Sequence, residues 1–118
     1  TNCSVATGRW YDPYDNAYFS SASEVQIDHF VPLSESHRSG AWAWSRERKT
    51  IFANTLNVPE QLIAVGGSSN SAKGSSDPSD WMPNNASYHC TYLRDWVKVK
   101  SIYRLGINSF RKRLYGYK

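Results

Sequence analysis

The sequence predicts a single α+β domain in which a small two-stranded core is surrounded by a mostly helical periphery. Residues 24–30 alternate apolar and polar side chains and residues 61–65 form a short apolar run, so both segments are predicted as strands. Residues 34–56 and 87–105 instead carry apolar side chains at helical intervals. With 118 residues and no long linker or internal repeat, the chain is expected to form one domain over residues 1–118.

The first segment, residues 1–23, is predicted to be irregular. Gly8, Pro13 and the pair Asp15-Asn16 are typical of turns, and the segment ends in a serine-rich stretch. Its aromatic residues are expected to pack it onto the domain; they are Trp10, Tyr11, Tyr14, Tyr18 and Phe19.

Residues 24–74 are predicted to hold both strands. Pro32 ends the first strand because proline cannot donate a hydrogen bond to a strand ladder. Residues 66–74, after the second strand, are small and polar, and composition alone favours a flexible loop there.

Between the strands, residues 34–56 are predicted to form a helical insertion. Ser34 is expected to cap a first helix, Gly40 to interrupt the insertion and Ser45 to cap a second helix.

Residues 87–117 are predicted to form the C-terminal helices. Gly106 is expected to end the first of them and Ser109 to cap the last. The first has an apolar stripe made of Tyr88, Tyr92, Trp96, Val99 and Tyr103. Before it, Asp77-Pro78 predicts a short helical turn.

The positive charge of the chain favours acidic partners but does not identify which class of partner it binds. The net charge is +4 and the pI is about 9.2. A basic domain often has an acidic partner, so nucleic acid, an anionic membrane surface and an acidic glycan are all compatible. No apolar run approaches the roughly 18 residues that a membrane span needs, and we expect no membrane segment.

Several features favour an extracellular protein. The chain begins at Thr1 without Met and without a signal peptide, as a processed secreted protein does. A disulfide between Cys3 and Cys90 would close most of the chain, the alternative being two free buried thiols. Asn2 and Asn85 each begin an Asn-x-Ser sequon and are candidates for glycosylation. We therefore expect a secreted protein with a Cys3–Cys90 disulfide.

The pair Asp28-His29 is the first candidate for chemistry. A neutral imidazole with a pKa near 7 suits the activation of water, and a carboxylate suits a hard cation. A single histidine is more often structural than catalytic, so the pair alone does not decide.

The surrounding pattern is more specific than the pair. The motifs in order are Gly8-Arg9-Trp10, Asp28-His29-Phe30-Val31-Pro32-Leu33-Ser34-Glu35, Ser39-Gly40-Ala41-Trp42, Phe52-Ala53-Asn54, Leu62-Ile63-Ala64-Val65, Asn70-x-x-Lys73-Gly74 and Pro78-x-x-Trp81. Together they resemble the HNH, or ββα-metal, endonuclease family, and in particular its small, mostly microbial nucleases. The resemblance extends from about Gly8 to Leu105.

This resemblance implies a ββα-metal site within residues 24–74. His29 would be the general base, and Asp28 and Asn70 would bind one divalent ion, Mg²⁺ or alternatively Mn²⁺, completed by water and phosphate. Lys73 would stabilise phosphate charge, the alternative being an ordinary exposed lysine. The chain is expected to bend near His29 so that Asp28 meets the metal while the imidazole faces the attacking water.

The family's middle position, usually Asn or His, is occupied here by Gln61. It would hydrogen-bond the ring of His29 and fix its tautomer, and Asn54 and Asn57 are nearby alternatives. Glu35 could orient the loop after His29 or hold the metal through a water.

Contacts with substrate are expected from basic side chains that neutralise phosphates. The candidates are Arg9, Arg38, Arg46, Arg48 and Lys49, each of which is also an ordinary surface charge.

The resemblance implies a secreted, monomeric, non-specific endonuclease that hydrolyses DNA, with RNA left open, and leaves 5′-phosphate ends. Two alternatives remain: a secreted basic module that binds nucleic acid or glycan, and a metal-free ribonuclease that uses His29 and Glu35 as acid and base.

Overall fold

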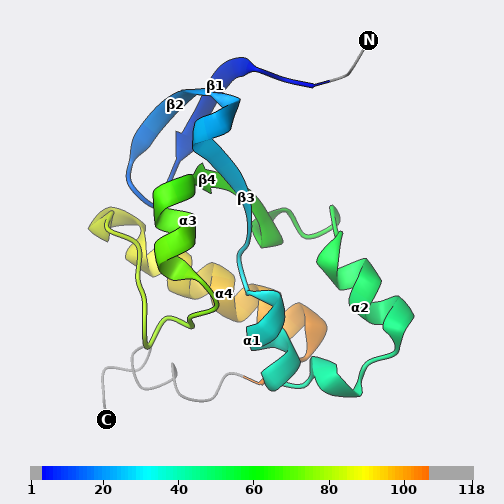
Figure 1. The fold of residues 1–118 in the computed structure, drawn as a ribbon. Coiled ribbons are helices and arrows are strands. Elements are labelled where there is room, and N and C mark those ends of the chain that lie inside the picture. The colour runs from blue at the N-terminus through cyan, green and yellow to red at the C-terminus, as the bar shows by residue number, and fades with distance from the viewer. Residues whose placement is uncertain (1–3, 107–118) are drawn as a thin grey trace.

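The computed structural model describes residues 4–106 and shows an α+β domain, as predicted (Figure 1). Two small antiparallel sheets, each of two strands, pack with helices that carry most of the core. None of the helices in the described part of the chain is long and apolar enough to cross a membrane.

The prediction that residues 1–23 are irregular is wrong for most of this segment. Strands β1 (Thr7–Asp12) and β2 (Ala17–Ser21) form an antiparallel hairpin. Of the residues that indicated irregular structure, Pro13, Asp15 and Asn16 make its turn, where Asn16 has a positive φ of 52°, and Gly8 lies within β1. Tyr11 and Tyr18 face each other across the strands with ring centroids 5.1 Å apart, a pairing that stabilises such a hairpin.

Strands β3 (Val25–His29) and β4 (Leu62–Gly66) form the second sheet, close to their predicted bounds (Figure 1). The 3₁₀ turn η1 (Ala22–Glu24) leads from the hairpin into β3. The register is regular from Val25↔Gly66 to His29↔Leu62. Gly66 is required at the end of β4, because a Cβ there would lie 3.0 Å from Asp12 Oδ2 and 3.1 Å from the ring of Phe19.

The insertion between the strands contains two helices, α1 (Leu33–Arg38) and α2 (Arg46–Ala53). The predicted cap at Ser45 is confirmed, since its Oγ accepts from the backbone N–H of Arg48 at 3.1 Å. The predicted cap at Ser34 is wrong: Ser34 already lies inside α1, which begins at Leu33 after Pro32 and has no side-chain cap. Gly40 separates the helices with a φ of 138°, which favours glycine.

Two 3₁₀ turns complete the insertion. The first, η2 (Ala41–Ala43), lies between α1 and α2, and the second, η3 (Pro59–Gln61), leads into β4.

Helix α3 (Gly67–Lys73) replaces the flexible loop that composition favoured. It lies against β3, where Asn70 Nδ2 donates to Gln26 Oε1 at 2.7 Å and Lys73 binds Asp28. Tertiary contacts therefore stabilise a helix whose residues have little intrinsic preference for one.

Helix α4 (His89–Tyr103), preceded by the 3₁₀ turn η4 (Ala86–Tyr88), confirms the predicted stripe. Tyr92, Trp96 and Val99 are fully buried and meet Phe30 and Val31 from the segment after β3. The helix ends in a left-handed Arg104 rather than at Gly106. The last helix predicted from Ser109 lies outside the described residues.

Candidate active site

Asp28 lies at the centre of a buried polar network between β3 and α3. The residue is 5% exposed, and its Oδ2 accepts from the hydroxyl of Tyr14 at 2.5 Å and from Lys73 Nζ at 2.6 Å. Among the described residues, Oδ1 has no hydrogen-bond partner. One carboxylate oxygen is thus fixed by the fold, and the other remains available as a ligand.

Lys73 is completely buried, so its interpretation as an ordinary exposed lysine is wrong. Besides Asp28, its Nζ donates to the carbonyl oxygens of His29 at 3.0 Å and Phe30 at 2.6 Å. Burial lowers the pKa of Lys73, and the neighbouring Asp28 carboxylate opposes this shift. In this arrangement the ammonium neutralises Asp28 and holds the end of β3, which differs from the expected contact with phosphate.

Tyr14 is a member of the site that the sequence did not identify, because it was grouped with aromatic residues expected only to pack. Its ring is fully buried against Phe30, Trp81 and Tyr92, with centroids 5.4–6.5 Å away. Burial, and then the charge of Asp28, raises the pKa of Tyr14 far above its ordinary value. The phenol therefore stays protonated and donates to Asp28.

His29, the last residue of β3, lies on the opposite face of the strand from Asp28. Its Nε2 is 2.8 Å from the carbonyl oxygen of Ala53. Because a carbonyl only accepts, Nε2 must carry the hydrogen, and in the neutral ring Nδ1 keeps its lone pair. Nδ1 has no hydrogen-bond partner within the described chain and can accept a proton.

The bend expected near His29 is present. The strand pairing is regular through His29, and the chain bends just after it, at Phe30 and Val31. Asp28 and His29 consequently face opposite sides, so a group touched by both would have to lie across the end of β3.

Gln61 does not orient His29, in contrast to the prediction. It is fully buried, and its side chain pairs with the backbone of Val31, accepting from its N–H and donating to its carbonyl, both at 2.9 Å. Among the described residues, neither alternative, Asn54 or Asn57, has a hydrogen bond to His29; the side chain of Asn54 donates to the carbonyl of Thr50 at 3.0 Å. The backbone of Ala53 has the orienting role, and a backbone carbonyl leaves no signal in the side-chain sequence.

The oxygen atoms of Asp28 and Asn70 are of the type that binds a hard cation, but the negative charge they offer is partly neutralised. Asn70 lies on α3 one turn before Lys73, and its Oδ1 has no partner among the described residues. Asp28 and Asn70 thus offer oxygen ligands of the kind that Mg²⁺ prefers. Lys73, however, already neutralises Asp28, and the described residues contain no group of three or more His, Cys, Asp or Glu that could hold a metal.

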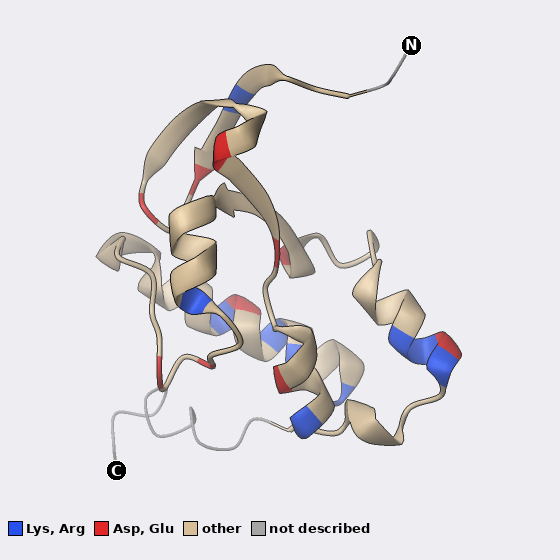
Figure 2. Cartoon of the chain, viewed as in Figure 1, with Lys and Arg blue, Asp and Glu red and all other residues tan. Residues whose placement is uncertain are grey.

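The expected phosphate-binding cations do not form one surface. Arg9 lies over the ring of Tyr18 in the hairpin, 4.2 Å from its centroid. Arg38 on α1 donates to the carbonyl of Ser75 at 3.3 Å. Arg48 and Lys49 lie on α2, where basic residues and Glu47 are adjacent (Figure 2).

The other candidates have structural contacts or lie outside the described residues. The carboxylate of Glu35 binds the buried ammonium of Lys100 and lies 3.6 Å from Arg38, which does not support a role as a free acid. Cys90 is exposed on α4, but Cys3 is outside the described residues, so the disulfide stays a prediction. Asn2 is outside them too, and Asn85 Nδ2 donates to the carbonyl of Pro13 at 2.9 Å.

Comparison with known proteins agrees with this architecture. Residues 1–114 match the family described as GmrSD restriction endonucleases, C-terminal domain. The chain belongs to this family, whose members are HNH-type nucleases. The resemblance deduced from the sequence motifs is therefore confirmed at the level of the family.

A relative is a protein of Arthroderma benhamiae described as an uncharacterized secreted protein. It is 48% identical over 111 residues, which cover 94% of this chain and 54% of the relative. The chain thus spans about half the length of that protein. No solved structure matches the chain significantly.

Proposed function

We propose that this chain is a secreted endonuclease that hydrolyses phosphodiester bonds in DNA, and in RNA if its site admits the 2′-hydroxyl. The observation that carries the proposal is the fixed imidazole of His29, with Nε2 on the carbonyl of Ala53 and Nδ1 without a partner among the described residues. A base in a single tautomer beside a nuclease-family site is suited to activate water. Secretion is supported by the description of the Arthroderma benhamiae relative.

His29 would act through Nδ1. It takes a proton from a water whose oxygen attacks phosphorus. The bond to the 3′ oxygen breaks and that oxygen takes a proton from a second water, leaving a 5′-phosphate and a 3′-hydroxyl. The Nε2–H bond to Ala53 is retained in both protonation states, so the ring need not reorient when it becomes charged. The phosphate would lie across the end of β3, within reach of both strand faces.

Asp28 and Asn70 are the residues that would hold a divalent ion, Mg²⁺ or Mn²⁺, through their unpartnered oxygens. When bound, such an ion would neutralise charge on the phosphate and stabilise the departing oxygen. Tyr14 and Lys73 hold the other oxygen of Asp28 in place. We also propose that the chain acts as a monomer and that its basic side chains bind substrate phosphates without sequence preference.

The test is cleavage of plasmid DNA and of RNA by the wild type and by His29→Ala, with and without EDTA. We expect at least a hundredfold loss in His29→Ala, since a positioned base contributes about 10²–10⁴-fold, with unchanged unfolding and metal binding. His89→Ala is the matched control, because the ring of His89 also bonds a backbone carbonyl, that of Pro83 at 2.5 Å, away from β3.

Each outcome has a distinct meaning. Near wild-type cleavage by His29→Ala would overturn the mechanism. Binding without turnover would indicate the basic binding module instead. RNA cleavage that persists in EDTA would indicate a metal-free ribonuclease, for which the ion-paired Glu35 offers no free acid.

A further inference from the structure

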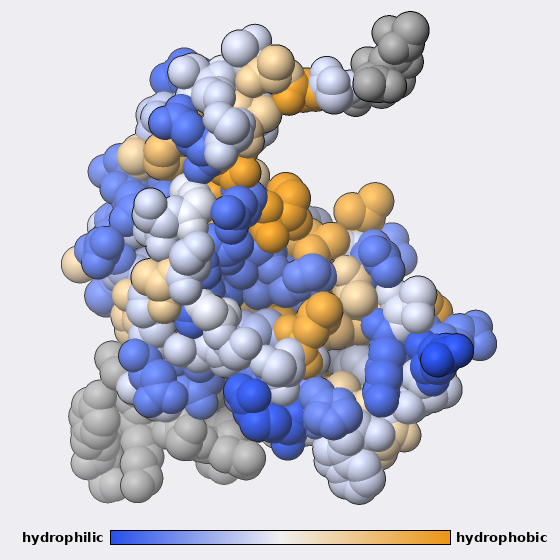
Figure 3. Space-filling view, in the orientation of Figure 1, coloured by the Kyte–Doolittle hydropathy of each residue, from blue (hydrophilic) through white to orange (hydrophobic). Residues whose placement is uncertain are grey.

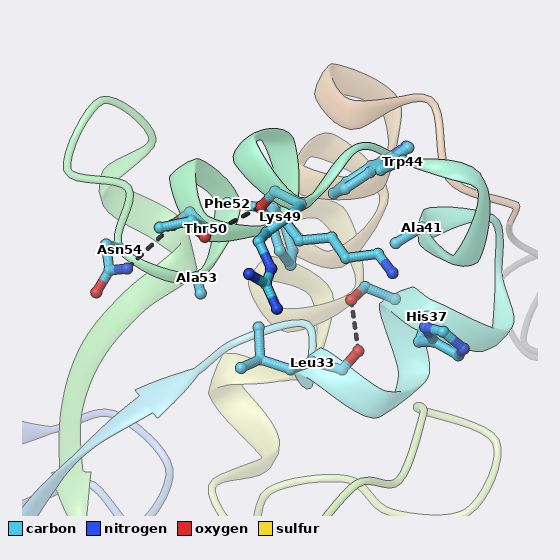
Figure 4. A pocket seen from close by; sticks show the side chains of 11 residues that line it. Leu33, His37, Ala41, Trp44, Lys49, Thr50, Phe52, Ala53 and Asn54 are labelled. Atoms are coloured by element: carbon cyan, nitrogen blue, oxygen red, sulfur yellow. Dashed lines mark hydrogen bonds between the residues drawn. The ribbon is translucent and has the colours of Figure 1, made fainter.

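A pocket beside His29 has no part in the mechanism described so far. It lies between α1, η2 and α2 and has a cavity volume of about 320 Å³ (Figure 4). This volume is at the lower end of the range for small-molecule sites. The pocket is therefore large enough for one flat aromatic ring with part of its substituent and too small for a folded partner.

The lining combines apolar walls with cations. Leu33, Trp44 and Phe52 supply apolar surface, and His37, Arg46 and Lys49 supply nitrogen groups. In Figure 4 the Lys49 side chain extends from α2 across the pocket towards the side where Ala41 and His37 lie. None of the described residues that line the pocket carries a carboxylate. A ligand with an apolar face and a negative charge fits this combination.

The pocket lies next to the group that orients His29, the proposed general base. Ala53 lines the pocket, and its carbonyl oxygen is the group that holds His29 Nε2 at 2.8 Å. Leu33 begins α1, four residues after His29 in the chain. If a phosphate of the substrate strand lies at His29, a neighbouring nucleotide of the same strand would therefore lie at the mouth of this pocket.

The surface around the mouth of the pocket also carries exposed apolar side chains, which catalysis on phosphates does not need. Leu33, which lines the pocket, is 42% exposed. Figure 3 shows apolar side chains gathered in the hollow between β3, α1 and α2, next to strongly hydrophilic surface. Exposed bases of single strands stack on such surface, whereas paired bases are hidden inside the duplex.

We propose that this pocket is a subsite for one unpaired nucleobase of the substrate strand, with Lys49 and Arg46 on the adjacent phosphate. The proposal rests on the function proposed above and names its substrate: a single strand, or a duplex opened at the cleavage point. The apolar walls take the base without reading its edge, so the subsite selects unpaired strands rather than a sequence.

The test is an equilibrium titration of the full-length His29→Ala protein in EDTA, so that no strand is cut. The ligands are a five-nucleotide single-stranded DNA and a blunt DNA duplex. The indole N–H of Trp44, resolved by ¹⁵N NMR, reports on the pocket. We expect a saturating shift with the single strand and at least tenfold weaker binding of the duplex.

Two variants of the pocket sharpen the test. Leu33→Asp should weaken binding of the single strand at least tenfold, because it places a negative charge at the mouth. Lys49→Ala should weaken it severalfold and reduce the slope of log affinity against log salt by about 0.7, the value for one phosphate contact on a single strand.

The matched controls carry the same changes on α4. They are Ile102→Asp, at a side chain that is 49% exposed, and Lys98→Ala, at a lysine paired with Glu60 at 2.6 Å. Neither should change binding. Equal losses in the controls, an unshifted Trp44 indole or equal affinity for duplex would overturn the subsite.

The subsite and the nuclease proposal can fail separately. If the wild type cleaves DNA while Trp44 is unmoved by the single strand, the subsite is wrong and the nuclease proposal stands. If the single strand binds at Trp44 and the wild type does not cleave DNA, the nuclease proposal is wrong and the subsite for an unpaired base stands.

Discussion

Two buried lysines hold the two ends of the segment that carries His29, and their carboxylate partners differ. Lys73 is completely buried and binds Asp28 before the bend, together with the carbonyls of His29 and Phe30. Lys100, 2% exposed, binds Glu35 on α1 after the bend, together with the carbonyl of Gly106 at 2.6 Å. A buried ion pair between a lysine and a carboxylate therefore fixes the segment at each of its two ends.

The difference lies in the second oxygen of each carboxylate. For Glu35 it is 3.6 Å from Arg38, so both oxygens have cationic neighbours within the protein. For Asp28 it has no partner among the described residues, and the bound oxygen is further oriented by Tyr14. Burial and ion pairing are common to the two carboxylates; the difference is the oxygen of Asp28 that has no partner among the described residues.

The largest expected effect comes from removing each ammonium in turn. Lys73→Met and Lys100→Met should each destabilise the protein by about 3–5 kcal/mol, because each leaves a buried carboxylate unpaired. Only Lys73→Met should then be stabilised by Mg²⁺ more than the wild type, since an ion can replace the ammonium beside Asp28. Urea unfolding with and without Mg²⁺ measures both. An equal response to Mg²⁺ in the two variants would remove the distinction between them.

Tyr14→Phe tests whether the hydroxyl at Asp28 matters beyond packing. Loss of a hydrogen bond to a charged group should lower the free energy of unfolding by about 1.5–3 kcal/mol and weaken Mg²⁺ binding. Tyr11→Phe is the control, because its hydroxyl bonds Asn16 on the exposed hairpin at 2.8 Å. Unfolding curves and Mg²⁺ titrations should separate the two variants; similar small effects would make Tyr14 a packing residue.

Asn70→Ala tests the second proposed ligand. Cleavage should fall about 10–100-fold at limiting Mg²⁺, by analogy with other groups that support metal sites, and excess Mg²⁺ should partly restore it. Gln26→Ala, which removes only the hydrogen-bond partner of Asn70, should have a smaller effect. The measurement is the cleavage rate as a function of Mg²⁺ concentration. If excess Mg²⁺ does not restore cleavage by Asn70→Ala, Asn70 has another role.

The smallest effect is expected at Asp12, which is buried near Asp15 at the base of the hairpin. Burial raises the pKa of Asp12 above its ordinary value of 3.8, against the hydrogen bond from the backbone N–H of Tyr14. Its contribution to stability is therefore present below pH 3.8 and is lost as the pH rises through the raised pKa. Asp15 has a lowered pKa, chiefly through its bond from Ser69, and contributes in the opposite sense.

Asp12→Asn should accordingly stabilise the protein at neutral pH by about 1 kcal/mol, since a buried charge is removed while the bond from Tyr14 can be kept. The gain should shrink towards pH 4. Thermal midpoints of both proteins across this range provide the measurement, and a variant that is less stable at pH 7 would contradict the expectation.

Much of the scaffold followed from local patterns. The alternation over residues 24–30, the cap at Ser45 and the stripe on α4 each predicted the observed element. Burial of one face accounts for the stripe on α4, whereas in β3 the apolar Ile27 is 63% exposed and Asp28 is buried. The hairpin was missed because its turn residues are the same ones that occur in irregular segments. Helix α3 was missed by composition because its stability comes from contacts with β3.

The sequence by itself determined the family, the two-stranded core and the pair Asp28-His29, since these depend on the order of residues along the chain. Only the tertiary structure decided what surrounds that pair. Tyr14 and Lys73 reach Asp28 from 14 and 45 residues away, and the carbonyl that orients His29 belongs to Ala53, 24 residues on. Such contacts depend on how distant segments pack and, at Ala53, on a backbone atom that every residue possesses.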